Sequence, residues 1–199
     1  AAKAGIKNGE ILRWINGREL RDIIDYQYLT ADEFLEMEVV DREGKSRRIS
    51  VEKEFDSDLG IIFESAVFDG IRSCCNRCIF CFVDQMPKGY RRTLYVKDDD
   101  YRLSFLYGNY ITLTNLREED FQRIAEDHLS PLYISIHCID PSMRKTILGV
   151  REQTPIMENL ERLAEVGVQM HGQIVLVPGY NDGDYLTETL AGIASLGDA

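Results

Sequence analysis

Over the first 55 residues, a short apolar run at 11–15 and two runs of alternating apolar and polar residues, at 34–40 and 47–51, predict a small module rich in β-strands. Strands are expected over three segments, 11–15, 34–40 and 47–51. Asn16-Gly17 and the polar run 41–45 are typical of the turns that join such strands. The apolar spacing of residues 22–29 predicts one short helix between them.

From about residue 60 onward, apolar runs alternate with segments of helical periodicity, which is typical of parallel α/β folds. After an apolar run at 66–71, strands are expected over 109–114, 131–137 and 172–177. Helices are expected over 117–128, from Thr154-Pro155 to Gly167, and over 184–194. The sequence therefore predicts a β-rich domain at 1–55 and an α/β domain at 60–199.

Three of the five cysteines form a C-x3-C-x2-C motif, and they are Cys74, Cys78 and Cys81. Thiolates this close in sequence can hold one iron–sulfur cluster. A cubane cluster has four irons and is normally held by four cysteines, so a loop with three leaves one iron without a protein ligand. That iron is free to bind a substrate or a cofactor.

Two other uses of these cysteines fit less well. A structural zinc site needs four protein ligands, and no second C-x-x-C or H-x3-H motif is found. A disulfide framework is disfavoured by the odd number of cysteines. Cys75 could replace Cys74 only by changing the spacing to C-x2-C-x2-C, so we take Cys74 as the ligand. Cys138 is expected to be a buried, small apolar residue.

With Phe80 directly before the last cysteine, the motif resembles the cluster loop of radical S-adenosylmethionine (radical SAM) enzymes. Four further segments, 82–89, 97–109, 112–115 and 177–183, resemble an uncharacterised subfamily of these enzymes. Its members join an N-terminal PDZ-like domain to a radical SAM barrel and a C-terminal domain of unknown function. The resemblance implies a partial, TIM-like parallel barrel in this chain, preceded by an incomplete PDZ-like module.

The N-terminal part of the resemblance rests on the string 4–12 and on Ile15-Asn16-Gly17, which are similar to the middle of a bacterial PDZ domain. The first strands and the carboxylate-binding loop of such domains have no counterpart here, so no peptide-binding residue is assigned. A module that binds a peptide or protein and a module that only packs on the enzyme domain are both open alternatives.

The resemblance also implies a mechanism. Cys74, Cys78 and Cys81 would hold a [4Fe–4S] cluster, whose open iron binds the amino and carboxylate groups of SAM, while the backbone near Phe80 lies against the adenine. An electron donor would reduce the cluster, and SAM would yield methionine and a 5′-deoxyadenosyl radical that takes hydrogen from an unidentified substrate. An iron–sulfur electron-transfer or sensing protein and a PDZ-type adaptor are the alternatives.

Candidate SAM contacts lie where the predicted strands end, because ligands of α/β barrels gather at the carboxyl ends of the strands. Alternation along 131–137 places Ser135 and His137 on the face opposite the apolar residues, and Gln173 is expected to point inward in the same way. Ser135 and Asn115 are the favoured contacts. No Gly-Gly-Glu follows the second strand, so Gly108-Asn109 or Thr114-Asn115 is expected to take its place. For all of these residues, a polar network that only supports the fold is the alternative.

Composition narrows the class of partner. The chain has 199 residues, 44% of them hydrophobic, and a net charge of −11, which disfavours a general nucleic-acid partner. The basic stretch 88–92 and the following run Lys97-Asp98-Asp99-Asp100 are expected to be solvated loops. No long apolar run and no signal-like start is found, so we expect a cytoplasmic protein with reduced cysteines. Because the chain begins at Ala1 and stops just after a helical pattern, we also expect it to be a fragment.

Overall fold

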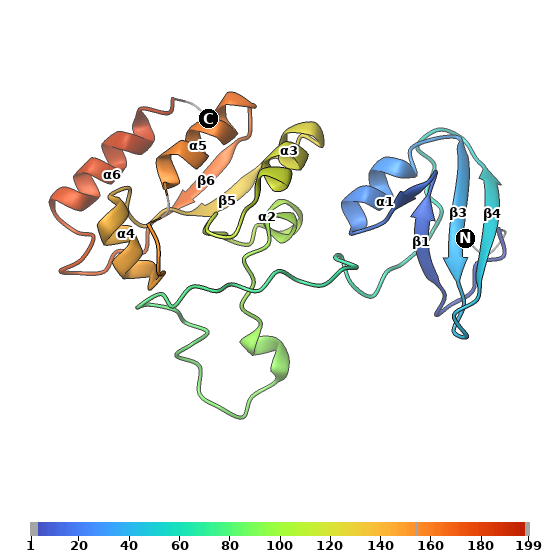
Figure 1. Cartoon of the computed structure of the whole chain (residues 1–199), viewed down its shortest axis with the longest axis horizontal. Coiled ribbons are helices and arrows are strands. Elements are labelled where there is room, and N and C mark those ends of the chain that lie inside the picture. The colour runs from blue at the N-terminus through green and yellow to red at the C-terminus, as the bar shows by residue number, and fades with distance from the viewer. Residues whose placement is uncertain (1–3, 154, 198–199) are drawn as a thin grey trace. The chain divides into compact units, whose positions relative to one another are not determined.

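The computed structural model of the chain describes residues 4–153 and 155–197 (Figure 1). It contains two compact units, which meet in the sequence at Ile71 and Arg72. The N-terminal unit is an antiparallel sheet with one helix. The C-terminal unit combines two parallel strands with several helices.

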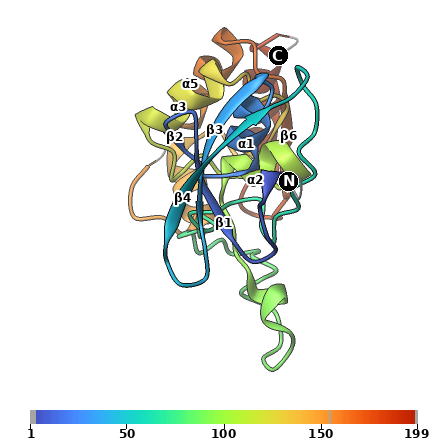
Figure 2. The same cartoon turned by 90° about the vertical axis from the view of Figure 1, so that its right-hand side faces the viewer.

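The sheet of the N-terminal unit has the strand order β2-β1-β3-β4. Its elements are β1 (Ile11–Ile15), β2 (Arg18–Glu19), α1 (Ile23–Leu29), β3 (Phe34–Val40) and β4 (Ser46–Glu52). The three predicted strands and the predicted helix are confirmed within one residue. The helix starts after Asp22 because the carboxylate of Asp22 accepts hydrogen bonds from the amides of Ile24 and Asp25. Figures 1 and 2 show α1 against one face of the sheet.

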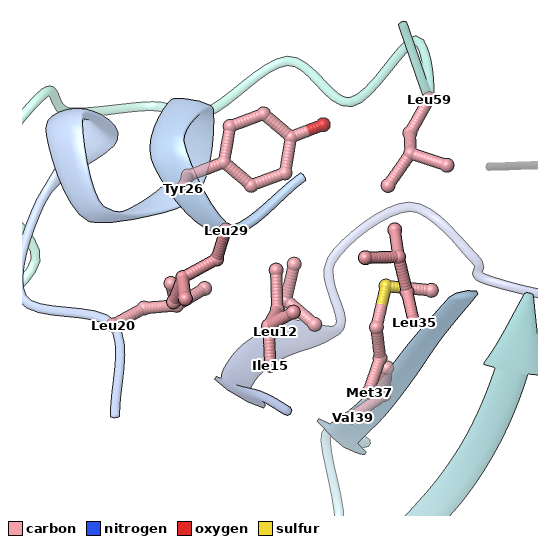
Figure 3. Close-up of a cluster of buried hydrophobic side chains, with 9 residues drawn as sticks. All are labelled: Leu12, Ile15, Leu20, Tyr26, Leu29, Leu35, Met37, Val39 and Leu59. Atoms are coloured by element: carbon pink, nitrogen blue, oxygen red, sulfur yellow. The ribbon is translucent and has the colours of Figure 1, made fainter. Parts of the chain in front are cut away.

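The core of this unit lies between α1 and the sheet (Figure 3). Alternation along β3 buries Leu35, Met37 and Val39, whereas Phe34 and Glu36 are exposed. Side chains from β1, α1 and the segment after β4 complete the cluster, which comprises Leu12, Ile15, Leu20, Tyr26, Leu29 and Leu59 as well. The hydroxyl of Tyr26 is buried without a hydrogen-bond partner among the described residues, and burial raises the pKa of Tyr26 to about 12.

Among its described residues, the C-terminal unit contains, after the short 3₁₀ helix η2 (Arg92–Tyr95), five α-helices and two strands. They are α2 (Tyr101–Tyr107), α3 (Glu118–Glu126), β5 (Leu132–Ser135), α4 (Pro141–Leu148), α5 (Ile156–Glu165), β6 (Met170–Gln173) and α6 (Asp184–Ala194). Strands β5 and β6 pair in parallel, with Ser135 opposite Gln173. No helix in the described ranges is long and apolar enough to span a membrane.

The predicted helices at 117–128 and 184–194 and the strand at 131–137 are confirmed as α3, α6 and β5, with shorter bounds for α3 and β5. The helix predicted from Thr154-Pro155 is α5, which begins after Pro155, and Thr154 lies outside the described residues. Helices α2 and α4 were not predicted. They have only seven and eight residues, too few for a periodic apolar stripe to stand out.

The strand predicted at 109–114 is wrong as an extended strand, because only Ile111 pairs, in parallel, with Ile134 of β5. Leu113 has a φ of 58°, which breaks the extended run. The amide of Thr112 is also bound elsewhere, since it donates to the carboxylate of Asp99 at 2.6 Å. Within the described residues, the parallel pairing is thus β5 with β6 and this one bridge, and no closed barrel is formed.

The strand predicted at 172–177 is displaced, because β6 ends at Gln173. Beyond it, side chains replace the neighbouring strand as partners: the amide of Val175 donates to Nδ1 of His137, and that of Val177 donates to Oδ1 of Asn181. The apolar run 66–71 forms a single antiparallel bridge, from Val67 to Asp22, inside the N-terminal unit. The spacing of apolar residues could not have predicted these hydrogen bonds and this bridge.

Candidate functional site

The cysteine loop, residues 73–82, has neither helix nor strand, and its three motif cysteines are buried to a similar degree. Cys74, Cys78 and Cys81 are half-buried, Cys75 is exposed, and Cys138, outside the loop, is fully buried as expected. All five thiols are free. The loop thus offers three partly accessible thiols, whereas Cys75 points to solvent.

The first tether of the loop is the segment just before α2. Ser73 pairs with Asp98 in an antiparallel bridge, and the amide of Cys74 donates to the carbonyl of Lys97 at 2.7 Å. One residue earlier, the carbonyl of Arg72 accepts from the amide of Asp99. These bonds fix the backbone at the first motif cysteine.

The second tether is the C-terminal end of α4. The amide of Arg77 donates to the carbonyl of Leu148 at 2.8 Å, and the amide of Ile79 donates to that of Ile147 at 3.0 Å. The last carbonyls of a helix have no partner inside the helix, so the loop satisfies two of them. Cys78 lies between the two donors and is thereby fixed from both sides.

The third tether is the buried side chain of Asn76. Its amide nitrogen donates to the hydroxyl of Thr112 at 2.9 Å, and its oxygen accepts from the hydroxyl of Thr114 at 3.1 Å. Asp99 accepts from both threonines, and the side chain of Asn115 donates to the backbone carbonyl of Asp99. Burial raises the pKa of Asp99, although the bonds from the threonines oppose the shift. A closed polar network therefore joins the loop to residues 112–115.

The run expected to be a solvated acidic loop is therefore largely buried. Asp99 and Asp100 are shielded from solvent, and Asp100 caps α2 through the amide of Arg102 while also pairing with its guanidinium. The expectation failed because these carboxylates have hydrogen-bond and charge partners, which make burial affordable. The partner of Asp99 is Thr112, 13 residues further along the chain, and the partner of Asp100 is Arg102 in α2, which was not predicted. The run of charges alone therefore did not reveal them.

Basic residues outnumber acidic ones in the sequence from the middle of the cysteine loop to Lys97. Between residues 77 and 97 the chain has five basic residues and one acidic residue, Asp84, although its net charge is −11. The ammonium of Lys97 donates to the carbonyl of Asn76 at 2.8 Å and to Asp84 at 2.6 Å. Burial disfavours its charge, but the bond to Asp84 and the nearby Cys81 and Cys74 raise the pKa of Lys97 overall. The loop is thus suited to carry the negative charge of thiolates.

Burial disfavours the thiolate forms of Cys74 and Cys78. Burial raises the pKa of Cys74 to about 11, and burial followed by the charge of Cys81 raises the pKa of Cys78. Metal binding at these positions must therefore release protons. Among the described residues, no group of three His, Cys, Asp or Glu side chains is arranged to hold a single metal ion. A [4Fe–4S] cluster does not require this, because each thiolate binds a different iron, so the donor set fits a cluster better than a single ion.

The two aromatic candidates meet at the loop. The ring of Phe80 packs edge-on against that of His137, with 4.7 Å between centroids. His137 lies beyond the end of β5 with a φ of 64°, so it does not continue the strand alternation that was used to orient it, yet it is buried. Burial, and then the charge of Arg144, lower the pKa of His137 to about 4, so the imidazole is neutral at pH 7. Its Nδ1 accepts the amide of Val175, which leaves Nε2 as a donor.

The other candidate SAM contacts lie in different parts of the C-terminal unit. Thr114 and Asn115 belong to the network of Asn76, beside the loop. Asn109 donates to the carboxylate of Asp98 at 2.8 Å, next to the first tether, whereas Gly108 ends α2 and lies against the ring of Tyr133. Ser135 is buried and pairs with half-buried Gln173 in the parallel sheet. The structure thus groups Phe80, His137, Thr114 and Asn115 around the loop, and leaves Gly108 apart.

Several residues at the site were missed. Arg144 of α4 is fully buried, and its guanidinium donates to the carbonyls of Thr112, Ser135 and Ile136. Burial lowers the pKa of Arg144 to about 10, a value at which it is still charged at pH 7. Asp140-Pro141 and Gly149, the start and stop signals of a helix, could have revealed α4. The roles of Asn76 and Lys97 had no sequence signal.

Comparison with known protein families identifies the kind of domain that contains the loop. A family model described as a radical SAM-like domain matches residues 53–199, a range that contains the whole cysteine loop and its tethers. The chain belongs to this radical SAM-like family. A comparison with curated proteins finds no match. Membership in the radical SAM-like family generally implies an iron–sulfur cluster and SAM.

Proposed function

We propose that this chain is a radical SAM enzyme in which Cys74, Cys78 and Cys81 hold a [4Fe–4S] cluster that leaves one iron for SAM. The observation that carries the proposal is the state of the three cysteines: all are free, half-buried and on one loop that is tethered from three sides. Cys75, which is exposed, and Cys138, which is buried elsewhere, are not ligands in this proposal.

A cluster held by Cys74, Cys78 and Cys81 would supply the one-electron reduction that cleaves SAM to methionine and a 5′-deoxyadenosyl radical, for which a substrate would be the hydrogen donor. The chain itself supplies position and charge. Lys97 lowers the energy of negative charge on the loop, and the network of Asn76, Thr112 and Thr114 keeps the loop in place. Phe80 and neutral His137 form an aromatic surface beside Cys81, against which the adenine is proposed to lie.

Ser135, Asn115 and Gln173 are proposed as SAM contacts. Ser135 is the best supported, because it is buried and its hydrogen bonds to Ile111 and Arg144 are made by its backbone, which leaves the side chain to a ligand. Thr114 and Asn115, rather than Gly108-Asn109, are proposed to take the place of the missing Gly-Gly-Glu. They are the pair that is bound to the cysteine loop through Asn76 and Asp99.

The domain arrangement is part of the proposal. Residues 60–199 would form part of a parallel TIM-like barrel, to which β5, β6 and the bridge at Ile111 contribute. Residues 1–55 would form a PDZ-like module, supported by the antiparallel sheet with α1 on one face. Such an enzyme needs an electron donor and a substrate that is not identified here. We propose the cytoplasm as its location, since five free thiols suit a reducing compartment.

The test is anaerobic reconstitution of the full chain with iron and sulfide, followed by SAM and dithionite. We expect 5′-deoxyadenosine and methionine in the wild-type protein and neither product in Cys78→Ala. An intact cluster that does not cleave SAM would favour an electron-transfer or sensing protein instead. Stoichiometric zinc without a cluster would overturn both, and would leave the PDZ-type adaptor as the alternative.

A further inference from the structure

We infer that Gly149 and the last turn of α4 are a positioning element for Cys78, which sets the backbone of the cysteine loop before any cluster is bound. The functional meaning of this element rests on the proposed function. Its physical effect does not, because the contacts belong to the protein alone.

The contacts fix the loop on both sides of Cys78. The amides of Arg77 and Ile79 donate to the carbonyls of Leu148 and Ile147, at 2.8 and 3.0 Å. Two bonds to consecutive carbonyls hold both the place and the direction of the short segment 77–79. Such bonds form only if the loop backbone comes close to the end of α4.

Gly149 is what allows this approach. A Cβ atom at position 149 would lie 2.4 Å from the carbonyl oxygen of Arg77 and 3.0 Å from its carbonyl carbon. Both atoms belong to the backbone of the cysteine loop, so no side-chain rotation could relieve the clash. Any other residue at 149 would therefore push the loop away from α4. Gly149 is exposed, so substitution there removes no core packing.

The displacement would act on Cys78 directly, since Arg77 is its neighbour in the chain. Groups that form a functional site must be held within about 0.5 Å of the productive geometry. To reach an ordinary contact distance of the order of 3.4 Å from a Cβ at position 149, the carbonyl oxygen of Arg77 would have to move away from its present 2.4 Å. A shift of that size exceeds the tolerance. We therefore expect a residue with a Cβ at 149 to impair cluster binding without unfolding the unit.

Gly167 offers a matched control. Gly149 directly follows α4, and Gly167 lies one residue further from its helix, after Val166 at the end of α5. Each glycine has a left-handed φ, 60° at Gly149 and 77° at Gly167. The two ends also share a hydrogen-bond pattern, in which the glycine amide bonds to the residue three before it. A Cβ at Gly167, however, would meet nothing within 4 Å. Gly149→Ala and Gly167→Ala thus share the backbone strain and differ in the clash with the loop.

The experiment compares the full chain with these two variants, first as apo-protein. Alkylation by iodoacetamide is followed at each cysteine by mass spectrometry, and Cys138 in the core reports any general loosening. We expect the rate at Cys78 to rise several-fold in Gly149→Ala only, with the rate at Cys138 unchanged. After reconstitution, we expect Gly149→Ala to hold less than half the iron of Gly167→Ala. Gly149→Asn should behave as Gly149→Ala, since asparagine tolerates a left-handed φ but still has a Cβ.

Equal alkylation of Cys78 in both alanine variants, with equal iron, would overturn the inference. A rise at Cys138 together with Cys78 in both Gly149→Ala and Gly149→Asn would also overturn it, because it would make Gly149 a residue of general stability. If the wild-type protein binds no iron, the proposed function fails, but the alkylation rates still decide whether Gly149 positions Cys78.

Discussion

The ammonium nitrogen of Lys97 lies 2.8 Å from the carbonyl oxygen of Asn76, in the middle of the cysteine loop. The backbone carbonyl of Lys97 accepts the amide of Cys74, and its ammonium also binds Asp84, three residues after Cys81. One residue therefore joins the beginning and the end of the loop, and places a positive charge beside the proposed ligands.

Lys97→Gln should lower the reduction potential of the bound cluster, because removal of a nearby positive charge disfavours the more negative, reduced state. Lys88→Gln is the control, since Lys88 is exposed and its substitution removes the same charge. The measurement is a redox titration followed by electron paramagnetic resonance. Equal potentials in the two variants would contradict this role of Lys97.

Cys74→Ala, Cys78→Ala and Cys81→Ala should each abolish the cluster, whereas Cys75→Ala and Cys138→Ala should keep most of it. The readout is iron content together with the broad absorption expected at about 400 nm for thiolate-bound iron. The exposed position of Cys75 makes it the informative variant. Loss of the cluster in Cys75→Ala, with Cys74→Ala silent, would mean that the ligand register is C-x2-C-x2-C.

Ser135→Ala and Asn115→Ala should each weaken SAM binding by roughly ten- to a hundredfold, the effect of about 1–3 kcal/mol for a lost hydrogen bond. The structure separates the two variants. The hydrogen bonds of Ser135 to Ile111 and Arg144 are made by its backbone, so Ser135→Ala should leave the cluster and the stability unchanged. Asn115→Ala also loses the bond to Asp99. The check is titration of SAM into the reduced protein, and unchanged affinity in Ser135→Ala would return this residue to a merely structural role.

The sequence predicted the features that depend on neighbouring residues, and it did not predict those that depend on contacts between residues far apart in the chain. Strands β1 and β3 were predicted because a short apolar run before a turn, and alternation, are local signals, and the cysteine motif is equally local. The three tethers of the loop were not predicted, because Asn76 meets Thr112, and Arg77 meets Leu148, only after the chain has folded back. Strand 109–114 failed for the same reason, since Asp99 takes the amide of Thr112 that a neighbouring strand would have bound.

Tyr26→Phe should stabilise the N-terminal unit by about 1 kcal/mol, because the buried hydroxyl of Tyr26 has no partner among the described residues, and such a group is a net loss on folding. Its ring packs edge-on against Phe63, which the substitution keeps. Trp14 is the single tryptophan of the chain and lies on β1, so its fluorescence during urea unfolding reports this unit. A less stable Tyr26→Phe variant would show that the hydroxyl is satisfied by water.

The N-terminal unit should lose stability as the pH falls from about 4.5 to about 2. Its residue Glu10 forms a two-bond ion pair with Arg47, both bonds at 2.7 Å, and this pairing lowers the pKa of Glu10 from 4.5 to about 2. A lowered folded pKa gives stability that is present above the unfolded pKa and is lost below it. Thermal unfolding monitored by Trp14 checks this. Glu10→Gln should flatten the pH dependence in this window, and an identical slope would contradict the assignment.

The tether between the cysteine loop and α4 has a consequence for biogenesis. During synthesis the three motif cysteines emerge about seventy residues before Ile147 and Leu148, whose carbonyls fix the backbone around Cys78. Contacts so distant in sequence form late, after the intervening chain has been ordered. Iron that arrives earlier would meet the three cysteines on a loop whose backbone is not yet fixed by hydrogen bonds to α4. Maturation of the proposed cofactor should therefore follow translation past Gly149, and partial unfolding of α4 should be enough to release it.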